Sequence, residues 1–339
     1  MFANLYKCLA TRTVRGGAGA FGAPRLSSRI FFHTSSKEVP GGSGQDDFEP
    51  PSFETSLPPS IPEGFQPLRL IDSEVIANNT KLLSFELPKG VSNLRELHVP
   101  TGVKVRKEVQ PGVVHNKSYS PVSLPSNSTQ IDIVVKRYAP RETSEGKIHG
   151  LGAFMCNDLN IGDSIDVKFK PRKLLAGRPY ESNRFKNIVF VGNGTGVAPL
   201  YQMALHVLEN DPSDSTNVWF ISAHRTEEDI ILGDKLEALH ENHGDGQFRS
   251  NTIILSQPQG KDGRYIDTCD FDNVPLPSSA NDVSTTHVVV CGTDGFLEHV
   301  CGMTSFRYEE DGTKHKQQGE LKGLLKRCGF SNKRSVTKL

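Results

Sequence analysis

A run of glycines is the first feature of the sequence that could do chemistry. It reads Gly192-Asn193-Gly194-Thr195-Gly196 and follows the apolar segment 188–191. Without Cβ atoms, such a backbone allows a phosphorylated nucleotide to approach closely, and a following helix would offer free N–H groups to phosphate. Pro199 suits an early position in that helix. A glycine turn before a helix is often purely structural, so the motif alone leaves both interpretations open.

A second candidate motif is the segment Lys117-Ser118-Tyr119-Ser120-Pro121-Val122-Ser123. The flat face of Tyr119 could lie against a flavin ring, and the neighbouring hydroxyl of Ser120 could form a hydrogen bond to it. The ammonium group of Lys117 could meet a pyrophosphate. An ordinary loop is the alternative interpretation.

A third motif, Cys291-Gly292-Thr293-Asp294-Gly295-Phe296, directly follows an apolar run. A small, polarisable side chain and a glycine at the carboxyl end of a strand leave room for a planar ring, in the crevice where α/β sheets bind ligands. A buried cysteine that only fills core space is the alternative.

Composition excludes several other classes of function. The chain has 339 residues, with 39 Lys and Arg against 39 Asp and Glu, so it has no basic excess to bind a nucleic-acid backbone. The six cysteines form no Cys-x-x-Cys pair and no Cys/His pair has zinc-ligand spacing, so neither a metal site nor a disulfide framework is expected. No apolar run is long enough for a membrane-spanning helix, so at most peripheral membrane contact is expected.

The N-terminal segment has the composition of a mitochondrial transit peptide. Residues 1–36 contain Lys7, Arg12, Arg15, Arg25 and Arg29 and no acidic residue. A membrane potential pulls such a basic segment inward, and acidic residues would oppose that motion. We therefore predict a transit peptide over residues 1–38, with a merely disordered tail as the alternative, and a Pro/Gly/Ser-rich linker over 39–66.

The elements that must position the motifs change character along the chain. Short β-prone runs separated by Pro, Gly and Asn turns predict a small antiparallel barrel, with strands expected at 68–71, 80–87, 96–99, 131–138 and 164–169. After residue 187, strands alternate with helices, which predicts a doubly wound α/β domain. Its strands are expected at 188–191, 217–223, 251–255 and 287–291, with helices after Pro199 and over 229–240.

The order of the motifs is more specific than any one of them. The order is 117–123, Val134-Val135-Lys136-Arg137-Tyr138, Gly150-Leu151-Gly152-Ala153, Ile161-Gly162-Asp163, 192–199 and Cys291-Gly292. Over about residues 67–339, this set resembles the NADH-cytochrome b5 reductase branch of the ferredoxin-NADP reductase family. The resemblance implies an antiparallel β-barrel FAD-binding domain at 67–180, followed by a doubly wound α/β pyridine-nucleotide-binding domain at 181–339.

The same resemblance implies two sets of binding residues. For FAD they are Lys117, Tyr119, Ser120, Pro121, Val135, Lys136, Tyr138, Gly150, Gly152 and Ala153. For NAD(P)H they are Gly194, Thr195, Gly196, Arg225, Asp229, Cys291 and Gly292. Asp229 favours NADH because an acid there bonds a ribose hydroxyl and repels a 2′-phosphate, whereas Arg225 favours NADPH. We predict NADH as the main co-substrate. In the alternative interpretation, the three acids 227–229 are only the solvated start of a helix and have no part in coenzyme binding.

Four positions depart from the family's pattern. Lys117 stands where the family has Arg, which loses a planar grip on pyrophosphate, and Ala153 replaces a Ser hydroxyl. Residues 293–295 replace a Pro-rich run, and the chain ends in Thr337-Lys338-Leu339 where an aromatic residue is common. These departures indicate a divergent branch of the family.

The function expected from the resemblance is hydride transfer from NADH to FAD, followed by electron transfer to a protein acceptor such as a cytochrome. The N-terminal segment predicts that this takes place in the mitochondrial matrix or at the inner membrane. Two alternatives stay open: a flavoprotein reductant that assists haem attachment to mitochondrial cytochrome c, and an assembly factor that binds FAD without turnover.

Overall fold

The structure is a computed structural model, and the part that it describes lies within one unit of the chain, residues 50–339. It describes residues 63–88, 102–123, 129–143, 146–170, 175, 177–244, 246–255, 264–275, 285–309, 312, 314–330 and 333–339. The predicted transit peptide (1–38), most of the predicted linker (39–66) and the predicted strand 96–99 lie outside these residues. None of the described helices is long and apolar enough to cross a bilayer.

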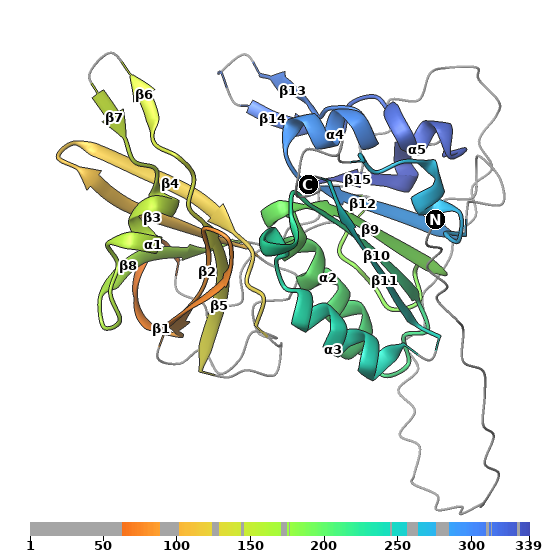
Figure 1. The fold of residues 1–339 in the computed structure, drawn as a ribbon, viewed down its shortest axis with the longest axis horizontal. Coiled ribbons are helices and arrows are strands. Elements are labelled where there is room, and N and C mark those ends of the chain that lie inside the picture. Colours follow the sequence, from red (N-terminus) through yellow and green to blue (C-terminus); the bar gives the residue numbers. More distant parts are fainter. Residues whose placement is uncertain are drawn as a thin grey trace, which may run out of the picture. The chain divides into compact units, whose positions relative to one another are not determined.

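An antiparallel barrel forms the first part of the described chain (Figure 1). Its elements are β1 (Gln66–Ala77), β2 (Thr80–Glu86), β3 (Val103–Gln110), β4 (Val113–Tyr119), β5 (Gln130–Lys136) and β8 (Ser164–Phe169), the hairpin of β6 (Arg141–Thr143) and β7 (Gly146–Ile148), and the helix α1 (Leu151–Asn157). The six main strands pair in the order β4-β3-β8-β1-β2-β5. Just after β4 the sheet closes on β5, because Pro121 bridges Ile133 and the Val122 amide donates to the Asp132 carbonyl at 2.8 Å.

The barrel interior is filled by alternate residues of its strands. Leu70, Phe85 and Ile133 are fully buried there, as expected where successive side chains point to opposite faces of a strand. Helix α1 adds Leu151 and Met155 to the same core, and this packing fixes the glycine-containing segment at its start.

A parallel sheet forms the second part. Its strands are β9 (Asn187–Asn193), β10 (Asn217–His224), β11 (Phe248–Ile254), β12 (Thr286–Cys291) and β15 (Val336–Lys338), in the order β11-β10-β9-β12-β15. Its helices are α2 (Val197–Glu209), α3 (Gly233–His243), α4 (Asp294–Val300) and α5 (Gly323–Arg327). Short 3₁₀ turns are η2 (Gly194–Gly196), η3 (Glu227–Asp229), η4 (Thr268–Phe271) and η5 (Lys333–Ser335), and β13 (Ser305–Tyr308) and β14 (Lys314–Gln317) form a separate hairpin.

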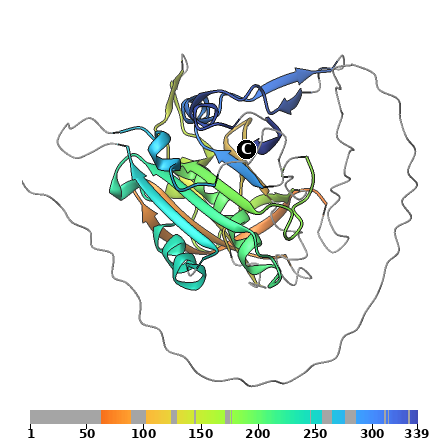
Figure 2. The same cartoon turned by 90° about the vertical axis from the view of Figure 1, so that its right-hand side faces the viewer.

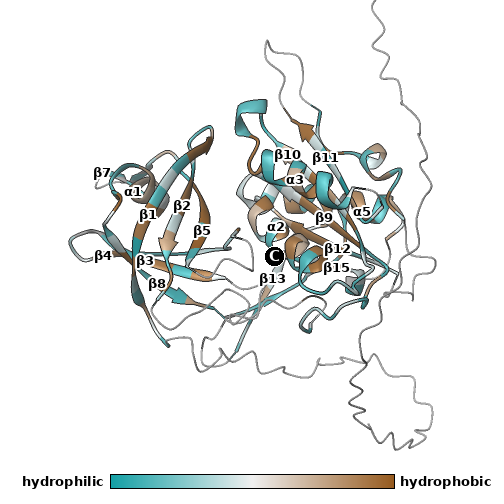
Figure 3. Cartoon of the chain, turned by 90° about the horizontal axis from the view of Figure 1, so that it is seen from below, coloured by the Kyte–Doolittle hydropathy of each residue, from teal (hydrophilic) through white to brown (hydrophobic). Residues whose placement is uncertain are grey.

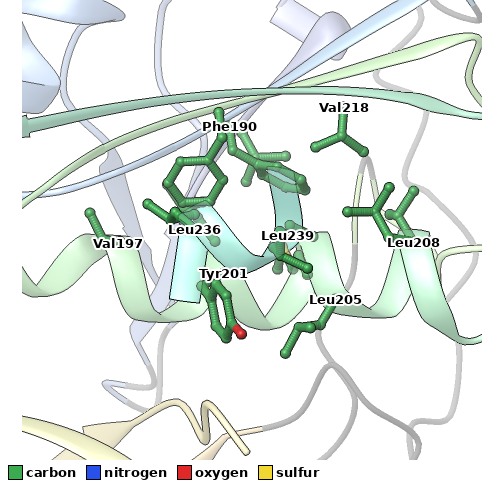
Figure 4. Close-up of a cluster of buried hydrophobic side chains, with 14 of the residues drawn as sticks. Phe190, Val197, Tyr201, Leu205, Leu208, Val218, Leu236 and Leu239 are labelled. Atoms are coloured by element: carbon green, nitrogen blue, oxygen red, sulfur yellow. The ribbon is translucent and has the colours of Figure 1, made fainter. Parts of the chain in front are cut away.

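Helices cover both faces of this sheet, which confirms the doubly wound fold. Helices α2 and α3 lie on one face and α4 and α5 on the other (Figures 1 and 2). Figure 4 shows the first layer, a core that Phe190 of β9 and Val218 of β10 share with Leu208 of α2 and Leu236 of α3. On the opposite face, Val288 and Val290 of β12 share a core with helices α4 and α5. The central strands are accordingly brown over most of their length in Figure 3.

One predicted helix begins later than expected. The segment 229–240 was predicted as a helix, but α3 spans Gly233–His243. Leu232 takes a left-handed backbone conformation (φ 61°) at the start of α3, which separates the helix from the preceding turn. Asp229 therefore ends the short turn η3 instead of opening a helix.

Candidate functional site

A cavity of about 670 Å³ is lined by residues of both the barrel and the parallel sheet. Of the predicted site residues, its lining contains Lys117, Tyr119, Ser120, Lys136, Tyr138, Gly194, Thr195, Gly196, Arg225, Asp229, Cys291 and Gly292. The parallel strands contribute their carboxyl ends to it, the edge at which open α/β sheets bind ligands. The fold thus brings the three motifs of the sequence to one place.

A second cavity of about 660 Å³ adjoins the first on the barrel side. The predicted residues Gly150, Gly152 and Ala153 line it. The two cavities share Lys117 and Tyr138 in their linings. An elongated ligand could therefore extend from one cavity into the other.

The barrel side of the site combines aromatic rings with a cation. Burial raises the pKa of Tyr119, with a smaller contribution from Cys156, so its phenol stays protonated and can donate a hydrogen bond. The ammonium nitrogen of Lys117 lies 5.2 Å from the centre of the Tyr138 ring. This distance is in the range of a cation–π contact, and it holds the cation at the junction of the two cavities.

The glycine turn approaches the end of β12 too closely for any side chain. A Cβ built on Gly196 would lie 2.4 Å from the Cys291 carbonyl oxygen and 2.6 Å from its carbon. Glycine is thus required there for packing. Gly194 has φ +52°, and a Cβ there would meet no atom within 4 Å, so bare backbone borders open space beside the cavity.

The turn after β12 is fixed by a similar close approach. A Cβ on Gly292 would lie 2.7 Å from the Phe296 ring and 2.8 Å from the side-chain oxygen of Asn193. That Asn193 oxygen accepts a hydrogen bond from the Thr293 amide at 3.0 Å. The half-buried Cys291 side chain lines the cavity together with Asn193, Thr195 and Thr293 of these two turns.

An ion pair joins the barrel to the parallel-sheet domain at the same cavity. The ammonium nitrogen of Lys136 lies 2.9 Å from Oδ1 of Asp229, and their side chains are only 21% and 10% exposed. The Thr226 hydroxyl donates to the other oxygen of this carboxylate at 3.3 Å. Burial would raise the pKa of Asp229, but Lys136, Thr226 and the charge of Arg225 outweigh it and hold the pKa below its usual range.

His224 is a residue of the cavity lining that the sequence analysis did not single out. It ends β10 and is 1% exposed, and neither ring nitrogen makes a hydrogen bond of normal geometry with the described residues. Burial lowers its pKa to about 4, against the opposing effect of the Asp229 backbone and carboxylate. His224 is therefore neutral at physiological pH. The signal that could have found it is its place at the carboxyl end of a parallel strand.

Two predicted residues line neither cavity. Val135 was predicted to bind FAD, but its side chain is fully buried in the barrel core, since alternation along β5 turns Val134 and Lys136 to the cavity instead. Pro121 was also predicted to bind FAD, and the structure places it, buried, in the bridge to Ile133 that closes the barrel. Lys170, just after β8, lines the first cavity and was not predicted; no local motif marks it.

The residues present fit a flavin dinucleotide. A Cβ on Gly150 would meet no atom within 4 Å, so backbone alone borders the second cavity there. The amides of Leu151 and Gly152 precede the first hydrogen bond of α1, from Ala153 N–H to the Gly150 carbonyl at 2.9 Å, and are available to phosphate oxygens. No group of His, Cys, Asp or Glu among the described residues could hold a metal ion.

Comparisons with known proteins agree with this geometry. Residues 67–171 match the oxidoreductase FAD-binding domain family, and residues 190–302 match the oxidoreductase NAD-binding domain family. NADH-cytochrome b5 reductase 2 of Neurospora crassa is 30% identical over 272 residues, which cover 79% of this chain and 71% of that protein. The protein of the same name from Emericella nidulans is 31% identical over 276 residues, covering 79% and 76%. Among solved structures, the cytochrome b5 reductase domain of Ulva prolifera nitrate reductase has a similar fold, with a TM-score of 0.58, 22% identity, and coverage of 83% of this chain and 100% of that one.

Proposed function

Because the chain belongs to the NADH-cytochrome b5 reductase family, we propose that it passes electrons from NADH through FAD to a protein acceptor in mitochondria. It is an oxidoreductase with an FAD-binding domain and an NAD-binding domain, and NADH is its co-substrate. Bound FAD supplies the chemistry of accepting a hydride and releasing the electrons. The side chains of this protein hold and orient the two cofactors.

The observation that carries the proposal is the convergence of Tyr119 and Cys291 on one cavity. Tyr119 and Ser120, from the barrel, would lie along the isoalloxazine and ribityl groups. Cys291 and Gly292, from the parallel sheet, are small enough to admit a nicotinamide ring beside them. Hydride transfer requires the two rings to be in near contact, so a cavity lined by both sets of residues suits the reaction.

The remaining polar groups suit the phosphates. Lys117, with the amides at the start of α1, would bind the FAD pyrophosphate in the second cavity. The backbone of Gly194–Gly196 would bind the nicotinamide nucleotide. The ammonium group of Lys136 would line the flavin edge of the cavity together with Tyr138, and it would form its ion pair with Asp229 at the coenzyme edge.

The test is an anaerobic absorbance titration of the purified chain with NADH. We expect bound flavin, with absorbance bands that bleach on addition of NADH. Flavin that stays oxidised under excess NADH would favour the assembly factor without turnover. A chain that neither copurifies with flavin nor reduces a dye after FAD is added would contradict the proposal.

The mitochondrial location is supported by the basic, acid-free residues 1–36. We expect a fluorescent fusion of the full chain to enter mitochondria and a fusion lacking residues 1–38 to stay outside. Sequencing the N-terminus of the imported chain would locate the cleavage. Cytosolic fluorescence of the full-length fusion would contradict this part of the proposal.

The acceptor is proposed to be a haem protein. Cytochrome b5 and cytochrome c are each mixed, in separate cuvettes, with the purified chain and NADH, and the haem absorbance is followed. The cytochrome whose haem absorbance changes is an acceptor. The alternative role in haem attachment predicts that a deletion strain accumulates apocytochrome c, whereas normal cytochrome c maturation would exclude that role.

A further inference from the structure

We propose that a lysine face on the outside of the barrel binds the anionic headgroups of a lipid membrane. The lysine face consists of Lys104 of β3, Lys168 of β8 and Lys170, which follows β8 directly. Strands β4, β3 and β8, which carry this face, are neighbours in the barrel sheet (Figure 1). This surface takes no part in hydride transfer, so it adds a membrane contact to the proposed function.

The alternation of residues along two strands turns the first two lysines outward. Val103 and Val105 of β3 and Val167 of β8 are buried in the barrel core, so Lys104 and Lys168 point to the opposite side. The strands pair so that Lys104 lies directly opposite Lys168. Like charges in directly opposed positions destabilise a sheet, and an anion bound to both ammonium groups would relieve their repulsion.

The third lysine is fixed beside this pair. The Lys170 ammonium group donates to the Ser118 hydroxyl at 3.0 Å, and Ser118 of β4 lies directly opposite Lys104. The stem of Lys170 runs past Gly102, where a Cβ would lie 3.5 Å from Cδ of the lysine. Three cationic side chains are therefore gathered around one serine on the outside of the sheet.

No acid among the described residues neutralises the pair. Lys104 and Lys168 form no ion pair or hydrogen bond with any residue that the structure describes. Asp166 faces outward two residues before Lys168, but it pairs with Arg106 at 2.8 Å, and these two charges cancel. Since lysine is protonated at neutral pH, the lysine face carries a charge of about +3.

The sequence extends the positive charge beyond the end of β8. Residues 168–173 contain Lys168, Lys170, Arg172 and Lys173 and no acid. A cluster of about four to eight lysines and arginines attracts the anionic headgroups of a membrane surface. The charge of the whole chain is zero, so this cluster is a local feature that the overall composition conceals.

The residue types on this face favour a lipid surface over a protein partner. The centres of protein interfaces are rich in aromatic side chains and arginine, and they are poor in lysine and serine. Around the Lys104 and Lys168 pair the outward side chains are those of Ser118 and Lys170. Compact ammonium groups on flexible stems suit the diffuse negative potential of a membrane, which requires no fixed geometry.

The lysine face adjoins the first cavity, because Lys170 also belongs to the cavity lining. Headgroups bound to the face would therefore lie beside the barrel side of the cavity. Lys168 and Lys170 are exposed, so the contact would be peripheral and would weaken as salt is added.

The test is cosedimentation of the full chain with lipid vesicles. One set of vesicles contains phosphatidylcholine alone, and the other contains phosphatidylcholine with about 30% of the anionic lipid phosphatidylglycerol. We expect the chain to bind the anionic vesicles more tightly than the neutral ones by about 10-fold or more. This difference should largely disappear when the salt concentration is raised from about 0.1 M to about 0.5 M.

Two double variants separate the lysine face from charge in general. Lys104→Gln with Lys168→Gln should weaken binding to anionic vesicles by about 10-fold or more. Lys186→Gln with Lys326→Gln removes the same charge at exposed residues of the parallel-sheet domain and should weaken it by less than about 2-fold. Both variants keep the basic residues 1–36, so any binding by that segment is the same in each. None of the four lysines lines a cavity, so reduction of bound flavin by NADH checks that both variants are folded.

Equal binding of the unaltered chain to neutral and anionic vesicles would overturn the proposal, and so would equal losses in the two double variants. Reduction of soluble cytochrome b5 without lipid tests a protein partner for the same face. If the Lys104 and Lys168 variant slowed this reduction but bound vesicles normally, the face would serve an acidic protein and the membrane contact would be wrong. Vesicle binding requires no turnover, so a failure of NADH to reduce the flavin would contradict the proposed function and leave the result on the lysine face intact.

Discussion

Lys136 and Asp229 are 93 residues apart in the chain, yet the Lys136 ammonium nitrogen lies 2.9 Å from an Asp229 carboxylate oxygen. The pair connects strand β5 of the barrel to the turn η3 of the parallel-sheet domain. A backbone hydrogen bond lies beside it, from the Asn78 amide to the Glu228 carbonyl at 2.7 Å. The coenzyme end of the cavity is therefore held to the barrel by a side-chain contact and a main-chain contact.

We expect this ion pair to couple the stability contributions of its two residues. Lys136→Ala or Asp229→Ala alone leaves a poorly exposed charge without its partner and should lower the free energy of unfolding by about 1–3 kcal/mol. The double variant should lose less than the sum of the two, by about 1 kcal/mol, in urea denaturation. The exposed pair Lys147 and Glu142, 3.7 Å apart, is the matched control and should show no measurable coupling. Additive losses at Lys136 and Asp229 would contradict the coupling.

Gly196→Ala should separate the glycine turn from the end of β12. Its Cβ would lie 2.4 Å from the Cys291 carbonyl oxygen, a clash with backbone that no rotamer change can relieve. The turn must therefore shift, and we expect NADH affinity to fall by about 10-fold or more, with a loss of thermal stability. Gly295→Ala is the control, because a Cβ there meets no atom within 4 Å. NADH binding equal to that of the control, measured by flavin reduction, would show that the turn does not contact the coenzyme.

Below about pH 6.5, the free energy of unfolding should decrease as the pH is lowered, because of His287. This residue is fully buried, stacks on Phe185 with ring centres 4.7 Å apart, and has Nε2 2.9 Å from the Thr337 hydroxyl. Burial, with a smaller effect of the charge on Arg184, lowers its pKa to about 3. An unfolded histidine has a pKa of about 6.5.

The unfolded chain therefore binds the proton first, so stability is highest above about pH 6.5 and declines as the pH falls toward 3. Urea denaturation at neutral pH and at about pH 5 measures this slope. His287→Gln should make the slope shallower. It should not remove it, since His224 also has a lowered pKa. An unchanged slope in the variant would contradict the assignment.

Tyr180→Phe should destabilise the junction that precedes the parallel sheet. The Tyr180 hydroxyl donates to Oδ2 of Asp214 at 2.6 Å and lies 3.0 Å from the Thr216 hydroxyl, and Asp214 is only 7% exposed. Removing the donor leaves a buried carboxylate short of one hydrogen bond, at a cost of about 1–3 kcal/mol. Tyr265→Phe, at a side chain that is 73% exposed, should change the free energy of unfolding by less than about 0.5 kcal/mol.

The strands of the parallel sheet could be predicted well from the sequence. The predicted run 188–191 corresponds to β9 and 217–223 to β10, because strands that are buried on both faces appear as continuous apolar segments. Strand β4 was missed. Its residues are exposed or half-buried along its whole length, so the sequence shows no alternation of apolar and polar residues to mark it.

The site could be predicted in part. Glycine turns and a Tyr-Ser-Pro motif are local patterns, and most of the residues they mark line the two cavities. The contact between Lys136 and Asp229 could not be predicted, because it depends on how β5 and η3 meet after folding. The role of Val135 was predicted from its place in a motif, and strand alternation turned its side chain into the core.

The last prediction concerns Lys117, which stands at the junction of the two cavities with its ammonium nitrogen 5.2 Å from the centre of the Tyr138 ring. A guanidinium group matches two pyrophosphate oxygens, whereas an ammonium group acts as a point charge. Lys117→Arg should therefore tighten FAD binding by about 3- to 10-fold, and Lys117→Met should weaken it by about 10-fold. Titration of the flavin-free chain with FAD, followed by flavin fluorescence, measures both changes. Lys168→Met, at an exposed residue of β8 outside both cavities, is the control for loss of charge. If Lys117→Met bound FAD as tightly as this control, Lys117 would not reach the FAD phosphates, and the amides at the start of α1 would have to hold them without it.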